Sequence, residues 1–145
     1  MLNIHFKVAK GMFFDRALIK QKVDTATRKR LSKFGAHVRQ TARQSIRKRK
    51  GSSRPGEPPS SHTGLLKQFI FFGYDENRRS VVIGPVVLAR KSSGIPEVLE
   101  HGGNITIQWG RARGKTVFIE SRPFMGPAFE CELEKVSSLW ANSVR

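Results

Sequence analysis

The segment from residue 15 to residue 48 contains no proline, and Gly35 is its only glycine. Along it, apolar or small side chains recur at steps of three and four residues, which places them on one stripe of an α-helix. The stripe consists of Val23, Thr27, Leu31, Phe34, Val38, Ala42 and Ser45. The pattern predicts one amphipathic helix of about 30 residues, and hence about 45 Å in length. Because such a helix is long enough to protrude from a small domain, we expect part of it to contact a partner.

The other side of the predicted helix is basic. It carries Arg28, Lys29, Lys33, Arg39, Arg43 and Arg47. No Asp or Glu occurs between Thr25 and Gly56, so the acidic partners that usually support a solvated helix face are missing. The whole chain has 27 Lys and Arg against 11 Asp and Glu, a formal charge of +16. This charge favours an acidic neighbour, and two interpretations stay open: a solvated face, or contact with nucleic acid or an acidic protein surface.

Residues 49–64 are rich in Gly, Ser and Pro, and the hydrophobic periodicity stops there. This composition predicts a loop. The basic run of the helix continues through Lys48 into this loop, which carries Arg49, Lys50 and Arg54. The loop is either an ordinary surface linker or an arm that reaches a neighbouring subunit or a phosphate backbone.

After the loop, the pattern is typical of strands. The four expected strands are residues 65–74, 80–88, 104–109 and 116–120. The turns "DENRR" and "GRARG" join them as two hairpins, so we expect one antiparallel sheet of about four strands. Residues 95–100 predict a short helical turn, ended by Gly102. Helical spacing from Pro127 onward predicts a C-terminal helix packed on the sheet. The expected fold is α+β, with residues 1–145 forming a single domain.

No pattern in the chain predicts an enzyme. The stretch "GRARGKT" has three residues between its glycines where a phosphate-binding loop needs four. No serine elbow, Cys/His pair or HExxH motif is present. The lone Cys131 and the four scattered histidines show no metal-ligand spacing. We therefore expect no catalytic residues, no cofactor, no metal and no membrane segment, and we expect the protein to be made in the cytoplasm.

Three stretches, taken in order, resemble the tail-completion and head-tail joining proteins of tailed bacteriophages, a family of neck proteins often called minor tail components. They are "PGEPPSSHTGLLKQFIF", "IPEVLEHGG" and "RPFMGPAFE". With the helix ahead of them they cover more than half of the chain. The matching positions are Thr63, Gly64, Leu65, Glu100, Gly102, Arg122, Pro123, Phe124, Pro127 and Ala128.

The resemblance implies a structural virion protein located at the head-tail junction. It implies a homo-oligomeric ring with six-fold symmetry, in contact with head-completion or connector proteins and with tail-tube or tail-terminator proteins. The basic side chains would then contact acidic neck proteins or packaged DNA. The alternative is a sequence-nonspecific nucleic-acid-binding protein that acts through the basic helix.

Two structural expectations concern the last of these stretches. Pro123 and Pro127 restrict the backbone on either side of Phe124, which we expect to anchor the last helix to the sheet. Arg122 and Glu100 carry opposite charges in neighbouring motifs, and we expect them to form an ion pair.

Overall fold

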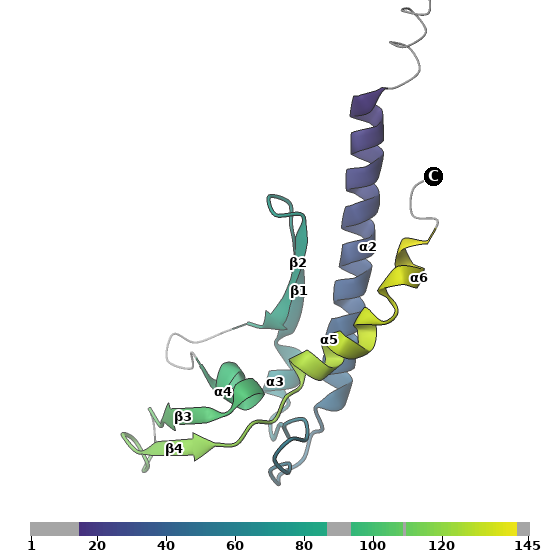
Figure 1. Ribbon diagram of the computed structural model, residues 1–145. Helices are drawn as coiled ribbons and strands as arrows, with labels where there is room; N and C mark the ends of the chain where they lie inside the picture. The colour runs from purple at the N-terminus through teal and green to yellow at the C-terminus, as the bar shows by residue number, and fades with distance from the viewer. Residues whose placement is uncertain (1–14, 87–93, 109, 142–145) are drawn as a thin grey trace, which may run out of the picture.

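The computed structural model describes residues 15–86, 94–108 and 110–141 of the chain. Figure 1 shows a long helix with smaller elements gathered around its C-terminal half. In chain order the elements are α2 (Arg16–Ser45), α3 (Leu65–Gln68), β1 (Ile70–Asp75), β2 (Ser80–Pro85), α4 (Ile95–His101), β3 (Gly103–Thr106), β4 (Thr116–Ile119), α5 (Met125–Leu133) and α6 (Val136–Trp140). Within the described ranges, no helix combines the length and the apolar content that crossing a membrane requires.

The predicted long helix is confirmed as α2, which spans 30 residues. Its start is fixed by Asp15, whose carboxylate accepts hydrogen bonds from the amides of Ala17 and Leu18 at 3.0 and 3.1 Å. Only part of the predicted stripe is buried. The buried residues of α2 are Ala26, Phe34, Gly35, Val38 and Ala42. Val23 is 43% exposed because the N-terminal part of α2 extends beyond the elements that cover its other half (Figure 1).

The first predicted hairpin forms and packs against α2. β1 and β2 pair antiparallel, and the Asp75 carboxylate closes the turn by accepting from the amides of Asn77 and Arg78. The approach to α2 is close at Gly35, where an added Cβ would lie 2.7 Å from a methyl carbon of Val81. A glycine in the middle of α2 therefore gives the hairpin room to dock.

The strand predicted from residue 65 begins later than expected. Residues 65–68 form the short helix α3, which follows Gly64 in the left-handed conformation (φ 83°). The apolar run favoured a strand, but local alternation cannot distinguish a strand from one helical turn in so short a segment. Val87, Leu88 and Trp109, which belonged to the predicted strands, lie outside the described residues.

The prediction of one four-stranded sheet is wrong. The structure contains two separate two-stranded antiparallel sheets, β1–β2 and β3–β4. β1–β2 packs on α2, whereas β3–β4 follows α4 and extends away from α2 (Figure 1). Alternation in the sequence identified the strands of both hairpins but carries no information about which hairpin edges meet.

The predicted C-terminal helix consists of two helices, α5 and α6, and both pack on α2 instead of on a sheet. In Figure 1, α5 crosses the lower part of α2, and α6 lies on the side of α2 away from the β1–β2 hairpin. Phe34 of α2 meets Phe129 of α5 edge to face, with ring centroids 5.6 Å apart. The shared core consists of Phe34, Val38, Ala42, Ile46, Ile70, Phe124 and Ala128. The apolar side of α2 contacts both the β1–β2 hairpin and α5, so both elements bury apolar side chains without a larger sheet.

Candidate functional site

Glu100 joins two elements that are distant in the chain. It lies in the last turn of α4, and its carboxylate accepts hydrogen bonds from the amides of Phe124 (2.9 Å), Met125 (3.0 Å) and Gly126 (2.7 Å). These amides are at the start of α5, where N–H groups have no partner within the helix. No side chain of α5 itself caps this end. Glu100 therefore acts as the N-terminal cap of α5 and places a negative charge at the positive end of the helix dipole.

Gly102, two residues after Glu100, has a backbone conformation that the joint requires. Its φ is 78°, a conformation that favours glycine. An added Cβ would lie 3.1 Å from the amide nitrogen of Ser121 and 3.4 Å from the carbonyl oxygen of Ile119. Gly102 thus lets the chain turn out of α4 and pass close to the segment that leads into α5.

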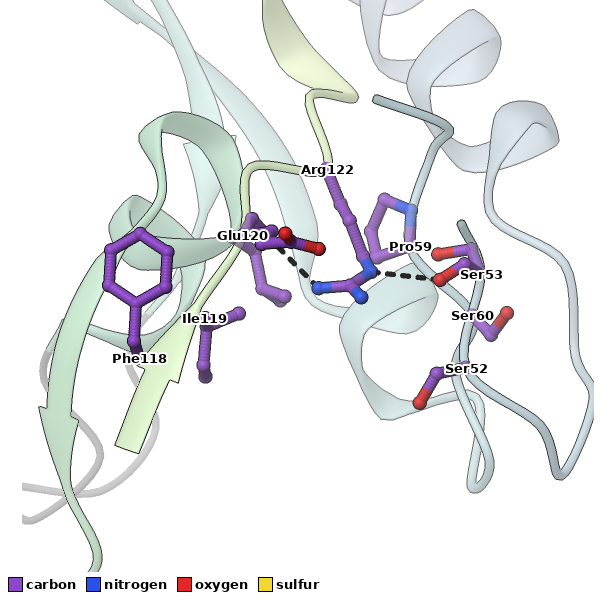
Figure 2. A pocket seen from close by; sticks show the side chains of 9 residues that line it. Ser52, Ser53, Pro59, Ser60, Phe118, Ile119, Glu120 and Arg122 are labelled. Carbon is purple, nitrogen blue, oxygen red and sulfur yellow. Dashed lines mark hydrogen bonds between the residues drawn. The ribbon is translucent and has the colours of Figure 1, made fainter. Parts of the chain in front are cut away.

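The predicted ion pair between Arg122 and Glu100 is wrong. The Arg122 guanidinium donates to two carbonyl oxygens instead, those of Ser53 (3.1 Å) and Glu120 (3.0 Å) (Figure 2). Both Glu100 oxygens are occupied by backbone amides of α5. Arg122 therefore ties the loop of residues 49–64 to the end of β4, a role that its charge alone could not reveal.

Phe124 anchors α5, as predicted, in a core formed by α2 together with Ile70 of β1, and α5 itself packs mainly on α2. The Phe124 side chain is 1% exposed and belongs to the shared core together with Ala128. The helix predicted from Pro127 begins two residues earlier, at Met125, so Pro127 lies in the first turn of α5, where a missing N–H costs no hydrogen bond within the helix. Pro123 precedes the buried Phe124.

Thr63, Gly64 and Leu65 mark the end of the loop. The amide of Gly64 donates to the Ser61 hydroxyl at 3.0 Å, and the amide of Leu65 lies 3.4 Å from the Thr63 hydroxyl oxygen. The Leu65 side chain is 50% exposed. These residues therefore shape the entry into α3 and contribute little to the core.

Three of the basic residues that we expected on a partner-binding face bind within the chain. Arg28 donates to Glu76 in the β1–β2 turn at 2.7 Å, and Arg39 lies over the ring of Phe72, 5.6 Å from its centroid. Arg43 donates to the carbonyl of Lys67 at 2.7 Å. Both partners of the Arg28 pair are mostly exposed, so the pair itself adds little stability. Together the three side chains line the side of α2 that holds the hairpin and α3.

The loop of residues 49–64 has its own internal contacts. Arg49 donates to the Ser60 hydroxyl at 2.7 Å and lies 3.8 Å from the Glu57 carboxylate. The carbonyl of Arg47 accepts from the amide of Ser61 at 3.0 Å. The loop is therefore folded back on the end of α2.

The remaining basic residues of the predicted set are all exposed. They are Lys29, Lys33, Arg47, Lys48, Lys50 and Arg54, and we call them the free basic surface. Within the part of the chain that the structure describes, none of their side chains forms an ion pair. This surface is available to an anionic partner.

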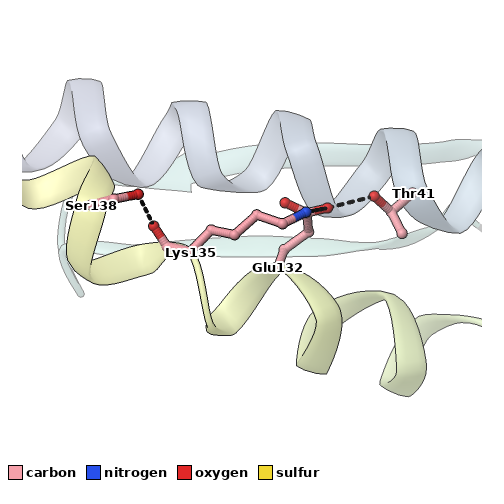
Figure 3. Close-up of polar contacts among 4 residues, drawn as sticks. All are labelled: Thr41, Glu132, Lys135 and Ser138. Carbon is pink, nitrogen blue, oxygen red and sulfur yellow. Dashed lines mark hydrogen bonds and ion pairs between the residues drawn. The ribbon is translucent and has the colours of Figure 1, made fainter.

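A polar cluster that sequence reasoning missed connects α5 to α2 (Figure 3). The largely buried carboxylate of Glu132 accepts from the Thr41 hydroxyl at 2.8 Å and from the Lys135 ammonium at 2.9 Å. The hydrogen bond from Lys135, followed by that from Thr41, lowers the pKa of Glu132 below its ordinary value. The hydrogen bond between Lys135 and Glu132 also raises the pKa of Lys135. No local pattern in the sequence indicates this contact, because Glu132 lies 91 residues after Thr41 in the chain.

A groove of about 530 Å³ lies between β4 and the loop of residues 49–64 (Figure 2). One wall contains Phe118, Ile119 and Glu120, and the other contains Ser52, Ser53, Pro59 and Ser60. The side chain of Arg122 spans one end of it. No sequence motif indicated this groove, because its walls come from segments more than fifty residues apart.

Among the described residues, no three or more His, Cys, Asp or Glu side chains gather closely enough to hold a metal ion. Comparisons with protein family models, with curated proteins and with solved structures gave no match to this chain.

The first prediction concerns the Glu100 cap. We expect Glu100→Ala to lower the free energy of unfolding by about 2 kcal/mol, because three amides at a helix start lose a charged acceptor. Amide hydrogen exchange at Phe124, Met125 and Gly126 should accelerate at the same time. Glu97→Ala, on the exposed side of α4, is the matched control and should leave both quantities nearly unchanged. Equal effects of the two substitutions would contradict the assignment of the cap.

The Glu132 cluster predicts a pH dependence. Because the folded state lowers the pKa of Glu132, its contribution to stability is complete above the unfolded pKa and is lost as the pH falls through the folded pKa. Glu132→Gln should therefore lower the Tm relative to the unmodified protein above about pH 5, and the difference should shrink at lower pH. Glu130→Gln, on the exposed side of α5, should show neither effect. A Tm difference for Glu132→Gln that stays constant down to pH 3 would contradict this account.

Proposed function

We propose that the chain is a structural protein of the neck of a tailed bacteriophage, a tail-completion component that joins the tail to the head connector as an oligomeric ring. The supporting observation is that two of the three motif stretches meet at one joint. Glu100 of one stretch caps the helix that begins in the other, and Gly102 allows the close passage between them. The motif residues thus have a shared structural task, as expected for a family pattern and not for a chance coincidence of short sequences.

The exposed part of α2 supports assembly. Leu18, Ile19 and Val23 are 43 to 50% exposed on a helix end that extends away from the core. A ring is built from head-to-tail contacts, in which one surface of each copy meets a different surface of the next. The exposed apolar side chains at the N-terminal end of α2 could form one of these two surfaces, and the elements packed around the C-terminal half of α2 in the next copy could form the other. Its neighbours would be head-completion or connector proteins on one side and tail-tube or tail-terminator proteins on the other.

The charge of +16 sets a condition on assembly. Copies of the protein repel one another at low ionic strength, so the ring forms when salt or an acidic partner neutralises the charge. Stable rings of the pure protein at low salt would contradict this point.

The test uses a phage in which the gene for this chain is disrupted. We expect filled heads and complete tails that stay separate, and we expect the purified protein to restore joined, infectious particles. Ile19→Glu should fold but restore far fewer particles, because it places a charge in the apolar contact. Gln21→Glu, an equally exposed position on the same helix, is the control and should restore joining. Normal joined particles without the protein would exclude the proposed function.

The free basic surface favours a second candidate, a sequence-nonspecific nucleic-acid-binding protein. If phosphate contacts are its main activity, substituting Lys29 and Lys33 together by Ala should reduce the slope of log K against log salt concentration by about two. Arg28→Ala should change the slope less, because Arg28 is bound to Glu76. Affinity for DNA that does not depend on salt would exclude this candidate.

A further inference from the structure

The outer edge of β4 carries backbone groups that have no partner among the described residues. β4 pairs with β3 on one side only. The amide of Ile107 donates to the carbonyl of Lys115, which fixes the phase of the hydrogen-bonded pairs. Since these pairs alternate along antiparallel strands, Thr116 and Phe118 direct their N–H and C=O groups away from β3. The unpaired N–H and C=O groups of this edge can therefore form hydrogen bonds with another strand.

The groove described above begins at the C-terminal half of this edge, where Phe118 lines it. In Figure 2, β4 has β3 on one side and the loop with Ser53 on the other. At the end of this groove the loop already pairs with the same chain segment, because the amide of Gly56 donates to the carbonyl of Ser121 at 2.9 Å. Arg122 fixes the separation of the two walls through the carbonyls of Ser53 and Glu120. The groove between the two walls has a volume of about 530 Å³.

The hairpin that carries this edge is short of partners. Each of its strands has four residues, and Phe118 is 67% exposed although it lies in a strand. An isolated two-stranded hairpin is marginally stable in water, and a third strand is the usual remedy.

The segments that supply the two walls of the groove are rich in basic residues. The loop of residues 49–64 carries Arg49, Lys50 and Arg54, and the turn before β4 carries Arg111, Arg113 and Lys115, all of them exposed. The acidic residues of residues 47–64 and 103–122 are Glu57 and Glu120. The two segments that supply most of the groove walls are therefore strongly basic, which favours carboxylates and disfavours another basic segment.

We propose that an extended acidic segment of a partner protein binds in this groove and adds to β4 as a third, antiparallel or parallel strand. Its backbone pairs with Thr116 and Phe118, and its carboxylates interact with the basic side chains of the loop and of the turn before β4. This is strand addition to a sheet edge, in which main-chain hydrogen bonds supply affinity and the flanking side chains supply specificity. The inference goes beyond the proposed neck function and does not depend on it.

The test uses a fluorescein-labelled peptide of about nine alternating valine and glutamate residues, the length of one long strand. Fluorescence anisotropy at low salt should show binding, and the same peptide with lysine in place of glutamate should not bind. The full chain is used throughout.

Two substitutions of one residue separate strand addition from simple charge attraction. Phe118→Thr removes the ring but keeps the N–H, and Phe118→Pro also removes the N–H at a position that does not pair with β3. We expect Phe118→Pro to bind the glutamate peptide at least about tenfold more weakly than Phe118→Thr, because a peptide carbonyl loses its donor. Circular dichroism and the Tm of the two variants confirm that both are folded.

Hydrogen exchange supplies a second readout. The peptide should slow exchange at the amides of Thr116 and Phe118 and leave that of Val117, which points toward β3, nearly unchanged. The proposal is overturned if the glutamate peptide does not bind or if both Phe118 variants bind it equally. It is also overturned if a single-stranded oligonucleotide produces the same protection at these two amides, because the groove would then recognise negative charge and not a strand.

Discussion

Phe34, Val38, Ala42 and Ile46 recur along the C-terminal half of α2, and two separate elements bury apolar side chains against them. The β1–β2 hairpin contributes Ile70, and the start of α5 contributes Phe124 and Ala128. Polar contacts orient the two elements on α2. The arginines of α2 contact the hairpin, and the Glu132 cluster joins α5 to α2. A large cavity in this core would release both neighbours together.

The Glu100 joint depends on that core and extends it. α5 is held on α2 by Phe124, so its first amides occupy a fixed position to which α4 can bind. Through α4 the joint also fixes the start of β3, and through Arg122 it fixes the loop beside β4. The orientation of the second hairpin, and with it the groove along the β4 edge, follows from three amide hydrogen bonds to a single carboxylate. This chain of dependence gives the motif residues a physical reason to occur together.

Local patterns in the sequence predicted the elements well. Stripe spacing predicted α2, the turn residues predicted both hairpins, and Gly102 predicted the end of α4. What failed were relations between distant segments: the number of sheets, the surface on which α5 packs, and the partner of Glu100. Periodicity records which side of an element is apolar but not which neighbour covers it, and opposite charge suggested an ion pair where backbone amides compete better for the carboxylate. The groove, the Glu132 cluster and the internal contacts of Arg28, Arg39 and Arg43 had no local signal.

The most direct test of the proposed role is the location of the protein in particles of the phage that encodes it. An antibody that recognises the folded protein, labelled with gold, would be applied to intact and disrupted particles and viewed by electron microscopy. The account predicts gold confined to the junction of head and tail. Particles that carry no gold in either form, with an antibody shown to bind the purified protein, would contradict a neck component and favour a protein that acts outside the virion.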